Sequence, residues 1–201
     1  ESIKKIFLSN PEVRLIFISS DAVFPSNLNM ASEKDRPFSQ NIYGNSKING
    51  ENIIKAENGL HLIVRTTIVG KDINPKYQSF LEWIIYSLVE GNEITLFDDV
   101  LFTPITTWQL LDELEWIVNN PITDVVHITG INPITKFEFG QKVGESLNLD
   151  TSLIKRGSIS DMAFKAKRAK DQTLNSEYYQ NISNRSLPSI TETINLITQN
   201  F

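Results

Sequence analysis

Apolar residues along this chain follow two spacings. Short runs rich in β-branched residues, typical of buried strands, alternate with longer segments in which apolar residues recur every three or four positions, typical of helices. Strands are expected at residues 15–19, 61–66, 93–97, 101–105 and 124–130. Helices are expected at residues 2–9, 41–57, 76–90, 106–119, 135–147 and 188–198. This alternation predicts an α/β fold, a doubly wound parallel sheet with helices on both faces.

The sequence also predicts where two of the helices begin. Thr106 with Gln109, and Thr135 with Glu138, each form the pattern of a capping box that opens a helix. Residues 25–40 carry prolines and asparagines between a strand and a helix, so we expect a loop there.

Composition narrows the class of protein. The chain has 201 residues, no cysteine and a net charge of −5 with intermixed signs. Disulfides, thiolate catalysis and cysteine-based zinc sites are therefore excluded, and neither nucleic acid nor a membrane is an expected partner. No apolar run is long enough for a membrane span and the N-terminus lacks a signal-peptide pattern, so a cytoplasmic location is expected.

The stretch YGNSK places Tyr43 and Lys47 one helical turn apart, so both side chains share a face. A free tyrosine has a pKa of about 10, so exchanging a proton near neutral pH requires a neighbouring positive charge. Lys47 can supply that charge. The same spacing also fits an ordinary exposed helix turn, and taken alone it does not decide between the two.

A third group strengthens the catalytic interpretation. Ser20 leaves the end of the strand predicted in FISSDAVF, and ligands of parallel α/β sheets sit at the carboxyl ends of strands. A strand-end serine, a loop and then a helix with this tyrosine and lysine are far more specific together than either part alone.

Several motifs carry a resemblance to a known family. The segments ISSDAVF, YGNSKINGE, VRTTIVG, VVHITG and RAKDQTLNSE resemble those of the extended short-chain dehydrogenase/reductases. The most similar branch is that of the dTDP-4-dehydrorhamnose reductases, which also includes the regulatory β subunit of methionine adenosyltransferase. The resemblance covers nearly the whole chain.

The resemblance implies a set of roles. Ser20, Tyr43 and Lys47 would be catalytic, with Tyr43 as acid/base and Lys47 on the nicotinamide ribose. Tyr43, Lys47, Thr67 and Val69 would bind NADP or NAD. A nucleotide-sugar substrate would meet Asp21, Ala22, Ile68 and Arg168. A homodimer is left open as the assembly.

The resemblance also implies a division of the chain. A partial NAD(P)-binding Rossmann domain would comprise residues 1–70 and 106–131, and a small α/β substrate-binding part residues 71–105 and 132–201. The family's GxxGxxG phosphate loop is not formed by any of the nine glycines. The first strands and the pyrophosphate site would thus lie outside this chain, which alone should bind a dinucleotide weakly and be inactive.

Departures from the family pattern bear on the substrate. Ala22 and Ile68 stand where the branch usually has aromatic residues of the sugar pocket, and Ala169 replaces a proline after Arg168. Sugar dehydratases of this superfamily carry a glutamate where this chain has Ala22, which argues against dehydration.

Three functions are weighed. An NAD(P)-dependent reductase of a nucleotide-bound 4-keto sugar is the leading hypothesis, an oxidoreductase in nucleotide-sugar or polysaccharide biosynthesis. The alternatives are a non-catalytic regulatory or binding subunit with the same fold, and a nucleotide-sugar epimerase. Arg168 lies in a cluster of basic residues. This cluster is consistent either with a solvated charged surface or with a binding site for a diphosphate. His61 and His127 sit in apolar strands without a ligand-spaced partner, so no metal site is expected.

Overall fold

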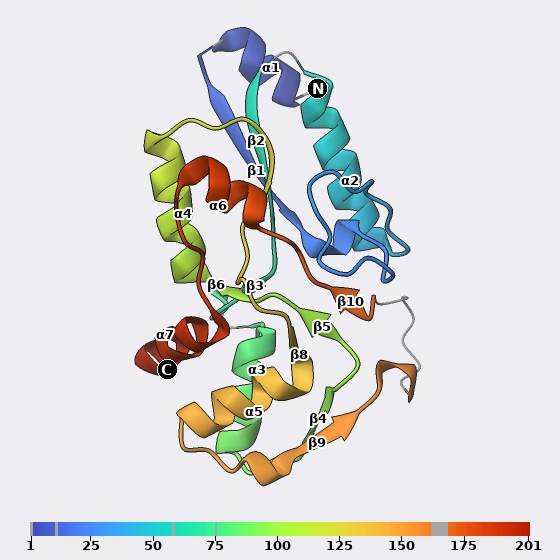
Figure 1. The fold of residues 1–201 in the computed structure, drawn as a ribbon, viewed down its shortest axis with the longest axis vertical. Coiled ribbons are helices and arrows are strands. Elements are labelled where there is room, and N and C mark those ends of the chain that lie inside the picture. The colour runs from blue at the N-terminus through green and yellow to red at the C-terminus, as the bar shows by residue number, and fades with distance from the viewer. Residues whose placement is uncertain (1, 11, 58, 75, 162–168) are drawn as a thin grey trace.

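The computed structural model describes residues 2–10, 12–57, 59–74, 76–161 and 169–201 (Figure 1). The helices are α1 (Ser2–Ser9), α2 (Ile42–Lys55), α3 (Phe80–Val89), α4 (Thr107–Asn119), α5 (Lys136–Ser146), α6 (Glu177–Ser183) and α7 (Ile190–Asn200). The strands are β1 (Arg14–Ser20), β2 (Leu60–Thr66), β3 (Ile68–Val69), β4 (Ile94–Phe97), β5 (Leu101–Phe102), β6 (Ile105–Thr106), β7 (Asp124–His127), β8 (Ile134–Thr135), β9 (Ile154–Gly157) and β10 (Asp171–Gln172).

A parallel sheet in the order β1-β2-β7 forms the upper half of the molecule. The central strand, β2, carries an uninterrupted buried apolar run, Leu62 to Val64, as expected for a parallel strand covered on both faces. Ser20 at the end of β1 pairs with Thr66 at the end of β2, so both strands stop at the same edge of the sheet. The predicted parallel sheet is confirmed.

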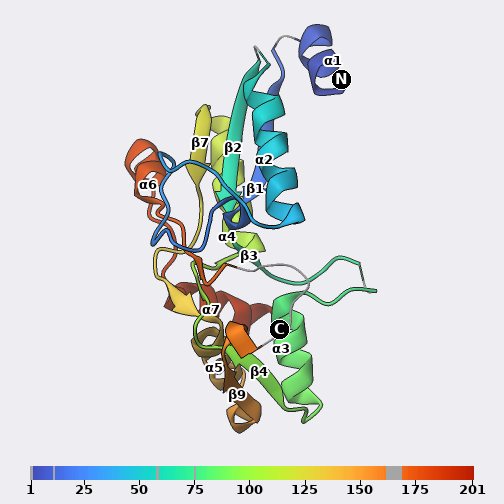
Figure 2. The ribbon, with the colours of Figure 1, turned by 90° about the vertical axis from the view of Figure 1, so that its right-hand side faces the viewer.

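Helices cover both faces of this sheet. Successive side chains of a strand point to opposite faces. Ile63 packs with Ile54 of α2, whereas Leu62 and Val64 pack with residues of α4 and with Tyr179 of α6. Figure 2 shows α2 on one side of the sheet and α6 on the other.

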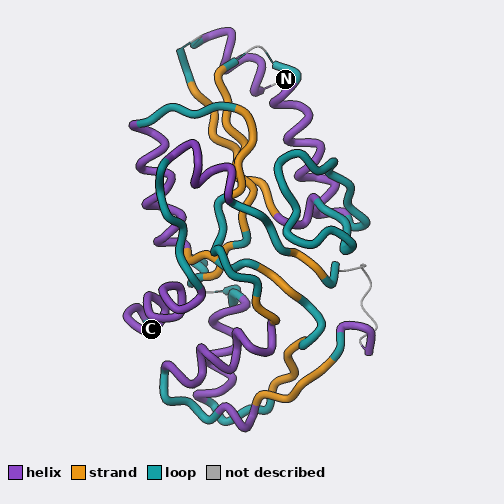
Figure 3. Tube along the Cα trace, viewed as in Figure 1, coloured by secondary structure: helices purple, strands orange, loops and turns teal. Residues whose placement is uncertain are grey.

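A second core lies below the sheet, where α3, α5 and α7 pack around the parallel pair β4 and β9. Phe102 and Phe139 meet edge to face at its centre. The chain passes between the two halves in irregular segments (Figure 3), so neither half is continuous in sequence.

Some boundaries differ from the sequence-based expectation. Helix α3 begins at Phe80 rather than residue 76, because Ser79 and Glu82 form a capping box. The strand expected at 101–105 is split into β5 and β6 around Pro104, which has no N–H for a ladder. Residues 177–183, for which no helix was predicted, form α6, which packs through Tyr179 on the sheet.

Among the helices that the described residues form, none is both long and apolar enough to span a bilayer.

Candidate active site

Ser20 occupies the carboxyl end of β1, where the chain turns into the short 3₁₀ helix η1 (Asp21–Val23). It is the N-cap of that helix: its hydroxyl accepts a hydrogen bond from the Ala22 N–H at 3.2 Å. The hydroxyl also donates to Oδ1 of Asp21 at 2.6 Å. The end of β1 and this N-cap together fix the position of the Ser20 side chain.

Helix α2 begins beside this turn. Asn41 caps it by accepting from the Gly44 N–H at 2.7 Å. Gly44 faces the loop after β1 so closely that a Cβ there would lie 2.1 Å from the Ala22 carbonyl oxygen. The first turn of α2, which carries Tyr43, is therefore pressed against the turn that follows Ser20. The Tyr43 side chain remains accessible, at 55% exposed.

Gly44→Ala should push this turn away from Ser20. The added methyl would collide with backbone, which cannot swing aside as a flexible side chain can. We expect a loss of about 1–3 kcal/mol in the free energy of unfolding and a fall in activity of about tenfold or more. The matched control is Asn49→Ala, an exposed position on the same helix, which should retain the wild-type stability and rate. Equal rates in the two variants would contradict the close approach.

Lys47 is held between helix and strand. Its Nζ donates to the Ile18 carbonyl oxygen at 3.0 Å. It lies 5.8 Å from the centroid of the Tyr43 ring and 5.3 Å from that of Phe17. The predicted pair is thus brought together, one turn apart on α2 and close to the end of β1.

Asp21 adds a carboxyl group beside Ser20. Burial raises the pKa of Asp21, while the hydrogen bond from Ser20 and the charge of Lys136 act in the opposite direction. Lys136 is the first residue of α5, so this interaction links the sheet to the lower half of the molecule.

The end of β2 supplies further groups. The Thr66 hydroxyl is buried and has no hydrogen-bond partner among the described residues. Thr67 follows β2, and its carbonyl accepts from the Ile105 N–H at 3.1 Å. In β3, Val69 is buried whereas Ile68 is 46% exposed. An apolar surface and an unused hydroxyl therefore adjoin the strand end.

Ala22 lines a small pocket between the loop after β1 and the start of α2. Polar side chains of Ser39, Asn41 and Gln172 contribute to its wall, together with Ala169. Arg168, predicted to contact substrate, lies outside the described residues.

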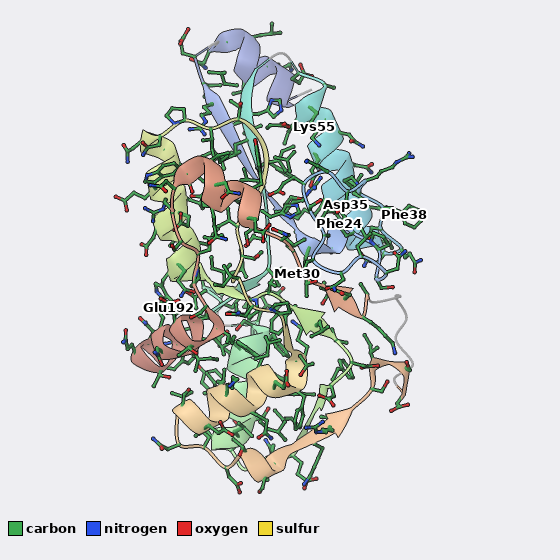
Figure 4. The ribbon with its side chains drawn as sticks, in the orientation of Figure 1. Phe24, Met30, Asp35, Phe38, Lys55 and Glu192 are labelled. Carbon is green, nitrogen blue, oxygen red and sulfur yellow. The ribbon has the colours of Figure 1, made fainter. Side chains whose placement is uncertain are left out.

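A buried polar network next to the site was not predicted. Glu51 of α2 accepts from Nε and Nη2 of Arg65 at 2.9 and 2.7 Å and from the Ser19 hydroxyl at 2.6 Å. Phe24, labelled in Figure 4, stacks its ring 4.9 Å from the Arg65 guanidinium. The available sequence signal was the position of Glu51, one turn beyond Lys47 on the same face.

His127 completes this network. Its Nδ1 contacts the Ala31 carbonyl at 3.1 Å, which requires a proton on Nδ1, so Nε2 accepts from Arg65 Nη1 at 3.4 Å. Burial, with the charge of Arg65, lowers the pKa of His127 to about 3. The ring is neutral and structural.

This lowered pKa predicts a loss of stability in mild acid. The unfolded chain protonates His127 near pH 6.5, whereas the folded chain does so only near pH 3, so stability falls as pH drops through that interval. Between about pH 7 and pH 5 the histidine should account for about 2 kcal/mol of unfolding free energy. Urea unfolding of His127→Gln should show a correspondingly flatter pH dependence. An unchanged slope would contradict a neutral, buried His127.

The described residues contain no group of three or more His, Cys, Asp or Glu side chains arranged to hold a metal ion.

Comparison with known proteins gives consistent relatives. A Haloferax volcanii protein named "Probable low-salt glycan biosynthesis reductase Agl14" is 25% identical over 81% of this chain and 55% of its own length. The dTDP-4-dehydrorhamnose reductase of Escherichia coli is 26% identical over 83% of this chain and 58% of its own length. The chain therefore spans somewhat more than half the length of these relatives.

A solved structure confirms the Rossmann-type fold. The crystal structure of dTDP-4-dehydrorhamnose reductase from Bacillus anthracis in complex with NADP superposes with a TM-score of 0.86 at 24% identity, over 94% of this chain and 66% of that one. The family described as the RmlD substrate binding domain matches residues 8–201. This match takes in the strand end at Ser20, the helix with Tyr43 and Lys47, and both cores, so the chain belongs to the RmlD substrate-binding domain family.

Proposed function

We propose that the protein is part of an NAD(P)-dependent reductase that acts on a 4-keto sugar attached to a nucleotide. The observation that carries this proposal is the juxtaposition of Ser20 at the end of β1 with the first two turns of α2, where Lys47 is tied to Ile18 beside the Tyr43 ring. The names of the two curated relatives support the same class of activity.

Each of the three candidate catalytic residues would have a separate role in the reduction of a carbonyl group. The cofactor would supply a hydride to the carbonyl carbon. Tyr43 gives the proton to the carbonyl oxygen as general acid, and Ser20 holds that oxygen by a hydrogen bond. Lys47 places its positive charge beside the Tyr43 ring and stabilises the phenolate that remains.

Asp21 affects how Ser20 can act. Ser20 donates to Asp21 in the substrate-free structure, so its hydroxyl must turn toward the carbonyl oxygen. Burial favours the protonated form of Asp21. A protonated carboxyl can donate to the Ser20 oxygen, which frees the serine proton for the substrate.

The end of β2 fits a nicotinamide cofactor. The buried Thr66 hydroxyl, which finds no hydrogen-bond partner in the part of the chain that the structure describes, is a polar group that a bound molecule could satisfy. Thr67 and the buried Val69 would flank the ring, with Lys47 on its ribose. Nothing in this part of the chain selects between NAD and NADP.

Substrate recognition is assigned to the pocket beside Ala22. Ala22, which lines this pocket, would contact the sugar, as would Asp21 and Ile68 outside the pocket lining. Arg168 would contact the diphosphate, because the arginine fork suits phosphate oxygens. Ala22 and Ile68 leave more room than aromatic residues would, which favours a sugar other than dehydrorhamnose. The division into a partial NAD(P)-binding domain (residues 1–70 and 106–131) and a substrate-binding part (residues 71–105 and 132–201) stays a prediction. A homodimer and a cytoplasmic location remain predictions.

A regulatory subunit is the second candidate. The observation that favours it is the replacement of two expected pocket aromatics by Ala22 and by the half-exposed Ile68. Such a protein would keep the fold and cofactor contacts without turning over a sugar.

Calorimetry of the full-length protein separates the two. NADPH is titrated first, and nucleotide-bound sugars are then titrated into the complex. A reductase should bind both, and Tyr43→Phe should still bind NADPH. Cofactor binding without any sugar binding, together with co-purification of a partner enzyme, would favour the regulatory subunit.

A further inference from the structure

Three polar residues occupy successive turns on one face of α2: Tyr43, Lys47 and Glu51. The proposed reaction uses the first two. Glu51 faces the sheet and is only 1% exposed, so its carboxylate is not available to contact solvent or substrate directly. Its buried charge needs another explanation.

The contacts of Glu51 fix both the position and the orientation of its carboxylate. Arg65 of β2, also 1% exposed, approaches with Nε on one carboxylate oxygen and Nη2 on the other. This two-point fork allows much less rotation than a single ion contact. The Ser19 hydroxyl of β1 adds a third bond at 2.6 Å.

These anchors lie directly beside the candidate catalytic residues. Ser19 precedes Ser20, and Lys47 of the same helix bonds to Ile18. Helix α2 is thus tied to β1 at two consecutive residues just before the strand end. Ser19, Arg65 and His127 are also paired across the three strands, so they form one transverse row on the face that α2 covers.

Energetics argue against a role in stability alone. Burying two charges costs several kcal/mol in desolvation, and well-packed apolar residues often stabilise such a position as well or better. An apolar contact, however, would allow α2 to shift along its own axis relative to the sheet. The two-point contact between Glu51 and Arg65 fixes the position of α2 along that axis.

We propose that Glu51 is a positioning residue. It fixes α2 along its own axis, so that Tyr43 and Lys47 lie beside Ser20. This inference rests on the proposed function. Displacement of a reacting group by about 1 Å can reduce a rate by about a hundredfold, so even a small shift of α2 should be measurable.

The chain contains a close structural control. Glu113 of α4 accepts from Nε and Nη2 of Arg185 at 2.6 and 2.9 Å and from the Tyr179 hydroxyl at 2.6 Å. This second carboxylate is likewise held by an arginine fork and one hydroxyl, although the Arg185 side chain is 34% exposed. It lies with α4 and α6 on the opposite face of the sheet. It can lose its charge without touching α2.

The experiment compares Glu51→Gln with Glu113→Gln in the full-length protein. Both should unfold at lower urea concentrations than the wild type. Only Glu51→Gln should lower kcat, by about ten- to a hundredfold, and weaken NADPH binding in calorimetry, with KM for the sugar within about twofold. Glu51→Gln kinetics that match those of Glu113→Gln in kcat and NADPH affinity would overturn the inference.

Two further variants keep the test decisive. If Glu51→Gln does not fold, Ser19→Ala removes a single bond to Glu51 and should still lower kcat about threefold or more; an unchanged kcat in a folded Ser19→Ala would overturn the inference in that case. Tyr43→Phe is run beside them. A wild type without cofactor binding or turnover, or a fully active Tyr43→Phe, would reject the proposed function itself, and the positioning role with it.

Discussion

Tyr43→Phe should reduce the rate of carbonyl reduction by about 10²–10⁴, the usual contribution of a general acid. The change removes one hydroxyl from a side chain that is 55% exposed, so the fold should be unaffected. The ring would remain beside Lys47, and NADPH binding should therefore persist. The measurement is steady-state kcat in the full-length protein, accompanied by cofactor affinity.

A second tyrosine provides the control for this prediction. Tyr178 of α6 is similarly exposed, at 47%, and lies on a different element. Tyr178→Phe should leave kcat unchanged. A Tyr43→Phe rate within about threefold of the wild type would show that another group donates the proton.

Arg65→Met should lower the free energy of unfolding by about 3–5 kcal/mol, because it leaves the buried Glu51 carboxylate with only the more distant Lys55, whose Nζ lies 3.9 Å from Oε2. Methionine fills a similar volume, so the loss reflects charge and hydrogen bonds rather than a cavity. The contact between the guanidinium and the Phe24 ring is lost as well. Urea unfolding of the full-length protein measures the effect.

An exposed ion pair shows whether burial is the cause. Arg156 contacts Asp98 at 2.6 Å, but its side chain is 65% exposed. Arg156→Met should cost no more than about 1 kcal/mol. Equal losses in the two variants would mean that the desolvated network around Glu51 contributes less than its geometry indicates.

Local patterns were sufficient to predict where Ser20, Tyr43 and Lys47 of the candidate site lie. Tyr43 and Lys47 share a helix face because of their spacing, and Ser20 lies at a strand end because an apolar run stops there. Both inferences need only the periods of helices and strands. The capping boxes at Thr106 and Thr135 were found in the same way and are confirmed.

Features that depend on register and packing could not be read in advance. Pairing of Ser19 with Arg65 requires knowledge of how β1 and β2 align, so the partner of Glu51 was not foreseen. Helix α6 is short, and its position on the sheet depends on the contacts of Tyr179 rather than on its own pattern. The close approach at Gly44 is likewise visible only in three dimensions.

Turnover by the full-length protein is the deciding measurement for the proposed reductase. The full-length protein is supplied with NADH or NADPH and a panel of nucleotide-bound 4-keto sugars, and loss of the reduced cofactor is followed together with formation of the nucleotide-bound 4-hydroxy sugar. We expect at least one sugar to be reduced with one cofactor oxidised per sugar, and this reaction to be lost in Tyr43→Phe. Tight binding of cofactor with no reduction of any sugar in the panel would contradict this expectation.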